Sequence, residues 1–119
     1  MLTGGDYLAI STDTSKNFQV LDEHYAVHVA ELFRAFSDTS RVRIMSVLVN
    51  GEVNVGALAK MVGVSESAVS HHLRWLRQIR LVTARRVGKE VYYRVDDAHL
   101  IALFQQGVEH ILLDQRERE

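Results

Sequence analysis

The sequence predicts a mainly α-helical domain that carries one small β-hairpin. Apolar residues recur at helical spacing through much of the 119 residues, and the chain contains no proline. In addition, two short runs that read as strands flank a Gly-Lys pair at residues 88–89, as in a tight hairpin turn. A chain of this length forms one compact domain. We expect that domain to span residues 18–115, between a flexible tail at 1–17 and a short tail at 116–119.

The first two helices are predicted on either side of the tetrapeptide SDTS at residues 37–40. Apolar side chains at helical spacing predict the first helix over residues 18–36. The hydroxyl and carboxylate groups of SDTS can cap the second helix. The pair Asn50-Gly51 then ends that helix.

Two further helices are predicted with a glycine-containing turn between them. Asn54 can cap the first, which ends at Gly63. Ser65 and Ser67 can start the second, and at least one of them is expected to act as its cap. This second helix runs to about residue 79, and its buried stripe consists of Val69, Leu73 and Leu76.

A hairpin and a final helix complete the predicted domain. Residues 81–87 and 90–95 read as two strands. Either Asp96 or Asp97 can cap the final helix. A helix, a turn, a second helix and a basic hairpin in this order describe a winged helix-turn-helix.

Positive charge is concentrated in one part of the chain. Residues 71–94 contain seven arginines and lysines and a single acidic residue, although the whole chain has a formal net charge of −1. Such a block indicates a face that binds a polyanion, and the predicted fold makes double-stranded DNA the expected partner. The side chains expected on this face are Ser67, Ser70, His71, Arg74 and Arg77 of the second helix and Arg85, Arg86 and Lys89 of the hairpin.

Other classes of protein are disfavoured by composition. The chain has no cysteine, so it forms no disulfides and offers no thiolate ligands to a metal. It has no long apolar run and no signal-peptide pattern, so we expect a cytoplasmic protein without a membrane partner. A zinc hydrolase would need an open coordination position beside a substrate pocket, and nothing in the sequence indicates a small-molecule substrate. We therefore expect a regulator and not an enzyme.

The order of these motifs resembles the ArsR/SmtB family of metal-responsive bacterial repressors. The resemblance begins at Glu31 and is carried by SESAVSHHLRWLR, by RLV before the basic hairpin, and by GKEVYYRV. It implies a homodimer that pairs through its first and last helices and binds an imperfect inverted repeat in the operator. By motif position, it also implies that Ser67, Ser70 and His71 contact the major groove.

A metal site is expected on the last helix. Asp97 and His99 lie near its start, and His110 and Asp114 lie near its end. An eleven-residue spacing separates the histidines by roughly 16 Å along the axis, so one chain cannot bring both to one ion. If the last helices of a dimer pair antiparallel, the start of one meets the end of the other. Two such sites suit tetrahedral Zn(II), with Co(II) or Ni(II) as further candidates.

The resemblance to zinc-sensing members is incomplete in one position. Such members usually place a fourth ligand three residues after the second histidine, where this chain has Leu113. Asp114 is one residue further and still within one helical turn of His110. His24 and His28, an i,i+4 pair on the first helix, could supply additional ligands. The alternative is a repressor whose metal site is vestigial and which responds to a non-metal signal.

Overall fold

The computed structural model describes residues 12–13 and 18–118. The chain divides into two compact units, Met1–Ser37 and Asp38–Glu119. Among the described residues, no helix is both long enough and apolar enough to cross a membrane.

The first unit contains a two-stranded ribbon and a helix. Strand β1 (Thr12–Asp13) pairs antiparallel with β2 (Phe18–Gln19), and helix α2 follows (Glu23–Arg34). The predicted start of this helix at residue 18 was wrong. Asp22 begins the helix instead, because its carboxylate accepts a hydrogen bond from the His24 amide at 2.9 Å. Residues 1–11 and 14–17 of the predicted tail lie outside the described residues.

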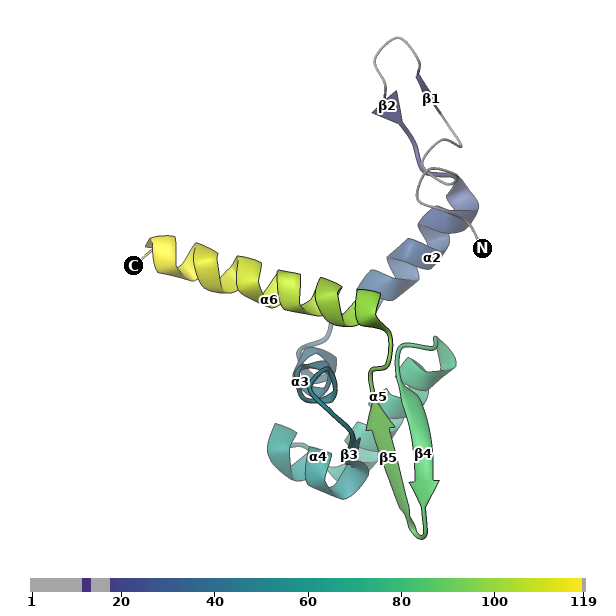
Figure 1. Ribbon diagram of the computed structural model, residues 1–119, viewed down its shortest axis with the longest axis vertical. Coiled ribbons are helices and arrows are strands. Elements are labelled where there is room, and N and C mark those ends of the chain that lie inside the picture. The colour runs from purple at the N-terminus through teal and green to yellow at the C-terminus, as the bar shows by residue number, and fades with distance from the viewer. Residues whose placement is uncertain (1–11, 14–17, 119) are drawn as a thin grey trace. The chain divides into compact units, whose positions relative to one another are not determined.

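The second unit contains four helices that begin at the predicted caps. They are α3 (Thr39–Leu48), α4 (Val55–Val62), α5 (Glu66–Gln78) and α6 (Ala98–Arg118), as Figure 1 shows. The Asn54 side chain accepts from the Ala57 amide at 2.8 Å, and Ser65 accepts from the Ala68 amide at 3.1 Å. Gly63 ends α4 in the left-handed region (φ 79°), which favours glycine. These interactions confirm the predicted turn between the two central helices.

The hairpin joins a third, short strand. Strands β4 (Thr83–Val87) and β5 (Glu90–Arg94) pair antiparallel around Gly88, whose φ of +61° suits a tight turn. Strand β3 (Val53–Asn54) pairs with the other edge of β5, so the order is β3-β5-β4. This pairing anchors the hairpin beside Asn54, the residue that caps α4.

The core of the second unit lies between α3, α4 and α5. The predicted stripe on α5 is confirmed, because its three members are fully buried. The largest fully buried side chains are Ile44, Met45 and Leu48 of α3, Leu58 of α4, and Val69, Leu73 and Leu76 of α5. Burying this stripe fixes which face of α5 points outward. The fold is a winged helix-turn-helix, as predicted.

Candidate functional site

The outer face of α5 presents the predicted polar side chains. Ser67 and His71 are exposed, and Ser70 is half-buried. Arg74 and Arg77 are exposed one and two turns further along the helix. This face therefore offers small hydroxyl groups near its start and positive charge near its end, as a helix that enters a DNA groove requires.

The two serines at the start of α5 have different roles. Ser65 is the N-cap, and its hydroxyl oxygen lies 3.2 Å from that of Ser67. Capping occupies Ser65 with the backbone of its own helix. Both residues are exposed, and Ser67 is the one whose hydroxyl does not serve as the cap.

A groove brings α5 and the hairpin together. Its volume is about 710 Å³, and it is lined by Ser70 of α5 and by Lys89 at the hairpin turn. Lys60 and Gly56 of α4 line it as well. Two residues that the sequence assigned to DNA binding from separate elements thus border one concave surface.

The three basic hairpin residues differ in their surroundings. Arg85 forms two contacts with Glu52: Nε donates to Oε2 at 3.0 Å, and a terminal guanidinium nitrogen donates to Oε1 at 2.5 Å. Arg86 and Lys89 are exposed. Glu52 was not expected at this site from the sequence, because it lies 33 residues from Arg85 and the pairing of β3 with β5 brings it near the hairpin.

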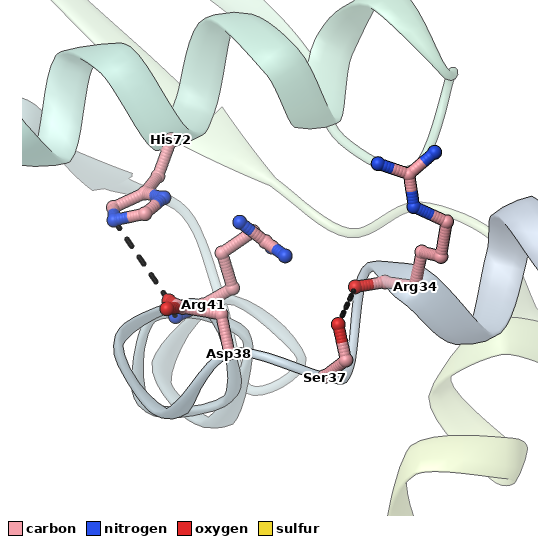
Figure 2. A network of polar contacts seen from close by, with 5 residues as sticks. All are labelled: Arg34, Ser37, Asp38, Arg41 and His72. Carbon is pink, nitrogen blue, oxygen red and sulfur yellow. Dashed lines mark hydrogen bonds and ion pairs between the residues drawn. The ribbon is translucent and has the colours of Figure 1, made fainter.

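A polar contact connects α5 with the start of α3. His72 points from α5 toward the Asp38 carboxylate, with Nε2 and Oδ2 3.9 Å apart (Figure 2). The backbone amide of Arg41 donates to that carboxylate and is the main reason why the pKa of Asp38 is lowered. Beside it, the Arg41 guanidinium lies 4.6 Å from the centre of the Trp75 ring. His72 therefore faces α3 while the adjacent His71 faces outward.

The start of α6 holds two of the predicted metal ligands together. Asp97 caps the helix, because its Oδ1 accepts from the amides of His99 at 2.8 Å and Leu100 at 3.3 Å. The same oxygen lies 3.5 Å from Nδ1 of His99, and the His99 side chain is fully exposed. The other predicted cap, Asp96, pairs with Arg94 at 3.0 Å.

The end of α6 holds the other two predicted ligands. His110 is exposed, and the carboxylate of Asp114 lies 3.4 Å from Nε of Arg118. Within residues 12–13 and 18–118, no three histidine, aspartate or glutamate side chains lie close enough to hold one metal ion. A single chain therefore brings together Asp97 and His99 but does not bring His110 to them.

An apolar surface accompanies these polar residues on α6. The C-terminal part of the helix extends beyond α3, α4 and α5 (Figure 1). Leu100 and Phe104, near the start of α6, are buried, whereas the apolar residues after them are exposed. The exposed residues are Val108, Ile111, Leu112 and Leu113. Four exposed apolar side chains at one helix end form an apolar patch of the kind that protein–protein contacts use.

The histidine pair on α2 is also preformed. The rings of His24 and His28 lie 4.9 Å apart between centroids and meet edge to face. Both side chains are exposed on the first unit. Two imidazoles one helical turn apart can share a metal ion, although they supply only two ligands.

Comparison with known proteins places this geometry among bacterial regulators. Residues 38–84 match the family described as "Bacterial regulatory protein, arsR family". The chain is 46% identical over 93 residues to the transcriptional repressor SmtB homolog of Synechocystis sp., covering 78% of this chain and 70% of that protein.

Two solved structures share the fold. The AntR antimony-specific transcriptional repressor is 26% identical with a TM-score of 0.75, covering 91% of this chain and 96% of that one. A homodimeric winged helix-turn-helix DNA-binding domain from Mycobacterium bovis is 29% identical with a TM-score of 0.70, covering 82% and 93%.

Proposed function

The chain belongs to the ArsR family of bacterial regulatory proteins, and we propose that it is a dimeric, zinc-responsive repressor of transcription. In this proposal the metal-free dimer binds an inverted-repeat operator, and Zn(II) releases it. Membership of a family of regulators makes the chain a regulatory protein and not an enzyme. The observation that carries the metal proposal is the division of four candidate ligands between the two ends of helix α6.

The DNA-binding part of the proposal rests on the outer face of α5 and on the hairpin. Ser67, Ser70 and His71 would approach base edges in the major groove. Arg74, Arg77, Arg86 and Lys89 would contact phosphates and set the position of the protein. In a two-fold symmetric dimer, the two α5 helices would lie about one turn of DNA apart, which matches an inverted repeat.

The dimer in the proposal pairs α6 with its symmetry-related copy. Antiparallel pairing would cover the exposed apolar side chains at residues 108–113 and would bring each helix start to the other helix end. Val27 and Phe33 of α2 are exposed as well, which supports a contribution of the first helix to pairing. Each metal site would then consist of Asp97 and His99 of one protomer with His110 and Asp114 of its partner.

The residues present fit a zinc ion in three positions and less well in the fourth. The cap uses Oδ1 of Asp97, so Oδ2 would serve as the ligand, and both imidazoles are exposed. Asp114 must first leave Arg118. This chain has no cysteine, so its own side-chain ligands are nitrogen and oxygen atoms, which favour Zn(II), Co(II) or Ni(II) over thiophilic ions.

Zn(II) at both sites would cross-link the two last helices. The cross-link favours release only if the metal binds more tightly to the dimer shape that fits DNA less well. DNA then weakens metal binding by the same factor. Since α6 and α5 belong to one compact unit, a change in how two α6 helices pair would change the separation of the two α5 helices.

A mixing experiment tests whether the site is shared. One chain carries Asp97→Ala with His99→Ala, and the other carries His110→Ala, so neither homodimer has a complete site. A heterodimer regains one site, from the helix start of the second chain and the helix end of the first. We expect Zn(II) competition with a chromophoric chelator to detect binding only after the chains are mixed and allowed to exchange.

The matched control for this experiment is His24→Gln with His28→Gln on α2. This variant should keep the zinc stoichiometry of the parent chain. Loss of zinc binding in the control would move the site to α2, and failure of the mixed chains to bind zinc would contradict the shared site.

A second function follows if the site is vestigial. The observation that favours it is that Asp97 already serves as a cap and Asp114 already has a cationic partner. The protein would then bind its operator in the same manner but respond to a non-metal signal. DNA binding that is indifferent to zinc, cobalt and nickel would select this alternative.

A further inference from the structure

The hairpin contains an ion pair that crosses its sheet. Arg85 lies on β4, the outer strand, and Glu52 directly precedes β3 at the opposite edge. Their side chains meet through two hydrogen bonds, a geometry that holds a guanidinium in one orientation. The contact therefore joins the two edge strands of a sheet whose central strand is β5.

The surroundings of Arg85 support a fixed position. Its cross-strand partner on β5 is Tyr92, and the guanidinium carbon lies 5.8 Å from the centre of the Tyr92 ring. The side chain of Glu52 is only 25% exposed, whereas that of Arg85 is 62% exposed. Glu52 is thus the more enclosed partner, and Arg85 reaches over the sheet to it.

The electrostatics agree with the geometry. The hydrogen bond from Arg85 lowers the pKa of Glu52, and the same bond raises the pKa of Arg85. At neutral pH the pair is therefore fully charged. The bidentate contact uses Nε and one terminal nitrogen of Arg85, so a DNA phosphate cannot use that edge of the guanidinium at the same time.

Arg86 has different surroundings. Successive residues of a strand point to opposite faces, so Arg86 lies on the other face of β4 from Arg85. Its position opposite Val91 gives it an apolar cross-strand neighbour in place of the tyrosine opposite Arg85. The two adjacent arginines are therefore a natural comparison, because both are exposed and carry the same charge, whereas Arg85 is held by Glu52.

We propose that Glu52 withholds Arg85 from DNA and uses it to position the hairpin, so that Arg86 and Lys89 make the phosphate contacts of the wing. The inference rests on the proposed DNA binding. It differs from the sequence-based expectation that all three hairpin cations contact DNA. Arg85 is in this account a positioning residue, and Glu52 sets how many hairpin charges the DNA meets.

The salt dependence of DNA affinity tests this inference. Each phosphate contact contributes roughly 0.9 to the slope of log affinity against log salt concentration. Because the proposed dimer carries each side chain twice, we expect Arg86→Gln to reduce the magnitude of the slope by about 2 and Arg85→Gln to leave it unchanged. Anisotropy of a labelled duplex, measured at several salt concentrations, gives each slope.

A second variant tests the withholding directly. In Glu52→Gln the anionic partner is gone, so Arg85 of each protomer is free to meet a phosphate, and we expect the slope to steepen by up to about 2. The double variant Glu52→Gln with Arg85→Gln should return to the parent slope. Circular dichroism and a thermal melt establish that each variant is folded before its slope is compared.

The outcomes separate this inference from the proposed function. Absence of salt-dependent DNA binding in the parent chain would contradict the proposed function. With salt-dependent binding present, an Arg85→Gln slope that falls as far as that of Arg86→Gln would overturn the inference alone. An unchanged slope in Glu52→Gln would overturn it as well, because releasing Arg85 would then have added no contact.

Discussion

At the scale of single residues, the Glu52 carboxylate provides a prediction about pH. Its pKa is lowered because Arg85 donates a hydrogen bond to it. A lowered pKa means that the contact is fully present above the ordinary pKa of glutamate and is lost as the pH falls through the lowered value. We expect a carbon-13 NMR titration of Glu52 to give a midpoint below that of glutamate in a peptide.

The matched variants for this titration are the two neighbouring arginines. Arg85→Gln should move the Glu52 midpoint up toward the peptide value, and Arg86→Gln should leave it in place. If both variants raise the Glu52 midpoint equally, the cause is the general positive charge of the hairpin and not the specific contact between Arg85 and Glu52.

A second residue-scale prediction concerns the fourth metal ligand. Asp114 is paired with Arg118 one helical turn away, and an exposed pair of this kind contributes only weakly to free energy. Arg118→Gln frees the carboxylate, so we expect zinc affinity to rise by up to about fivefold. Arg116→Gln removes the same charge from the same helix end and should change affinity less. Equal effects of the two variants would contradict ligation by Asp114.

Residue-scale features could be predicted from the sequence only where they are local. Asn54, Ser65 and Asp97 act as caps because a side chain and a backbone amide two or three residues away decide the contact. The partner of Arg85 could not be predicted, since it depends on which strand lies beside β5. For the same reason, Arg85 was expected to contact DNA, and its contact with Glu52 was not expected.

At the scale of elements, the end of α5 is held in an uncommon way. The Leu81 amide donates to the Leu76 carbonyl at 2.9 Å, and the Arg80 amide donates to the Arg77 carbonyl at 3.0 Å. This is the Schellman pattern, whose left-handed position is usually glycine. Here Arg80 occupies it with φ of +65°.

The left-handed conformation of Arg80 predicts a stabilising substitution. A residue with a Cβ atom is strained in this conformation, whereas glycine is not. We therefore expect the free energy of unfolding of Arg80→Gly to be roughly 0.5–1 kcal/mol higher than that of Arg80→Ala. The alanine variant is the control, because it also removes the charge but keeps Cβ. Urea denaturation measures the free energy of unfolding of both variants. Equal values would contradict a cost of the left-handed conformation at residue 80.

The elements themselves could be predicted well wherever an apolar stripe and a cap coincide. That coincidence holds for α3, α4 and α5, each of which begins at an expected cap. It failed at the first helix, where apolar residues before Asp22 extended the helical pattern. Phe18 and Gln19 pair with β1 instead, and strand pairing of so short a segment has no periodic signal.

At the scale of the whole molecule, the proposed metal site exists only in a pair of chains. Each α6 carries one half of each of two sites, and antiparallel symmetry would bring matching halves together twice. The sequence could indicate the ligands through their spacing. It could not indicate that Asp114 lies beside Arg118, because this contact depends on side-chain placement.

In the proposed arrangement, zinc binding and DNA binding are coupled reciprocally. If zinc weakens DNA binding by some factor, operator DNA must weaken zinc binding by the same factor. Coupling of this kind is typically about 1–3 kcal/mol, or roughly 5- to 150-fold. The two factors, measured independently, should therefore agree.

The most direct test uses a labelled duplex from the region upstream of the gene. The metal-free protein is bound at fixed salt, Zn(II) is titrated, and a chelator is then added while anisotropy is followed. We expect stoichiometric release that the chelator reverses, and we expect His110→Ala to bind the duplex without being released by zinc. Tight binding of the parent protein that ignores zinc, or zinc-induced release of His110→Ala, would contradict this expectation.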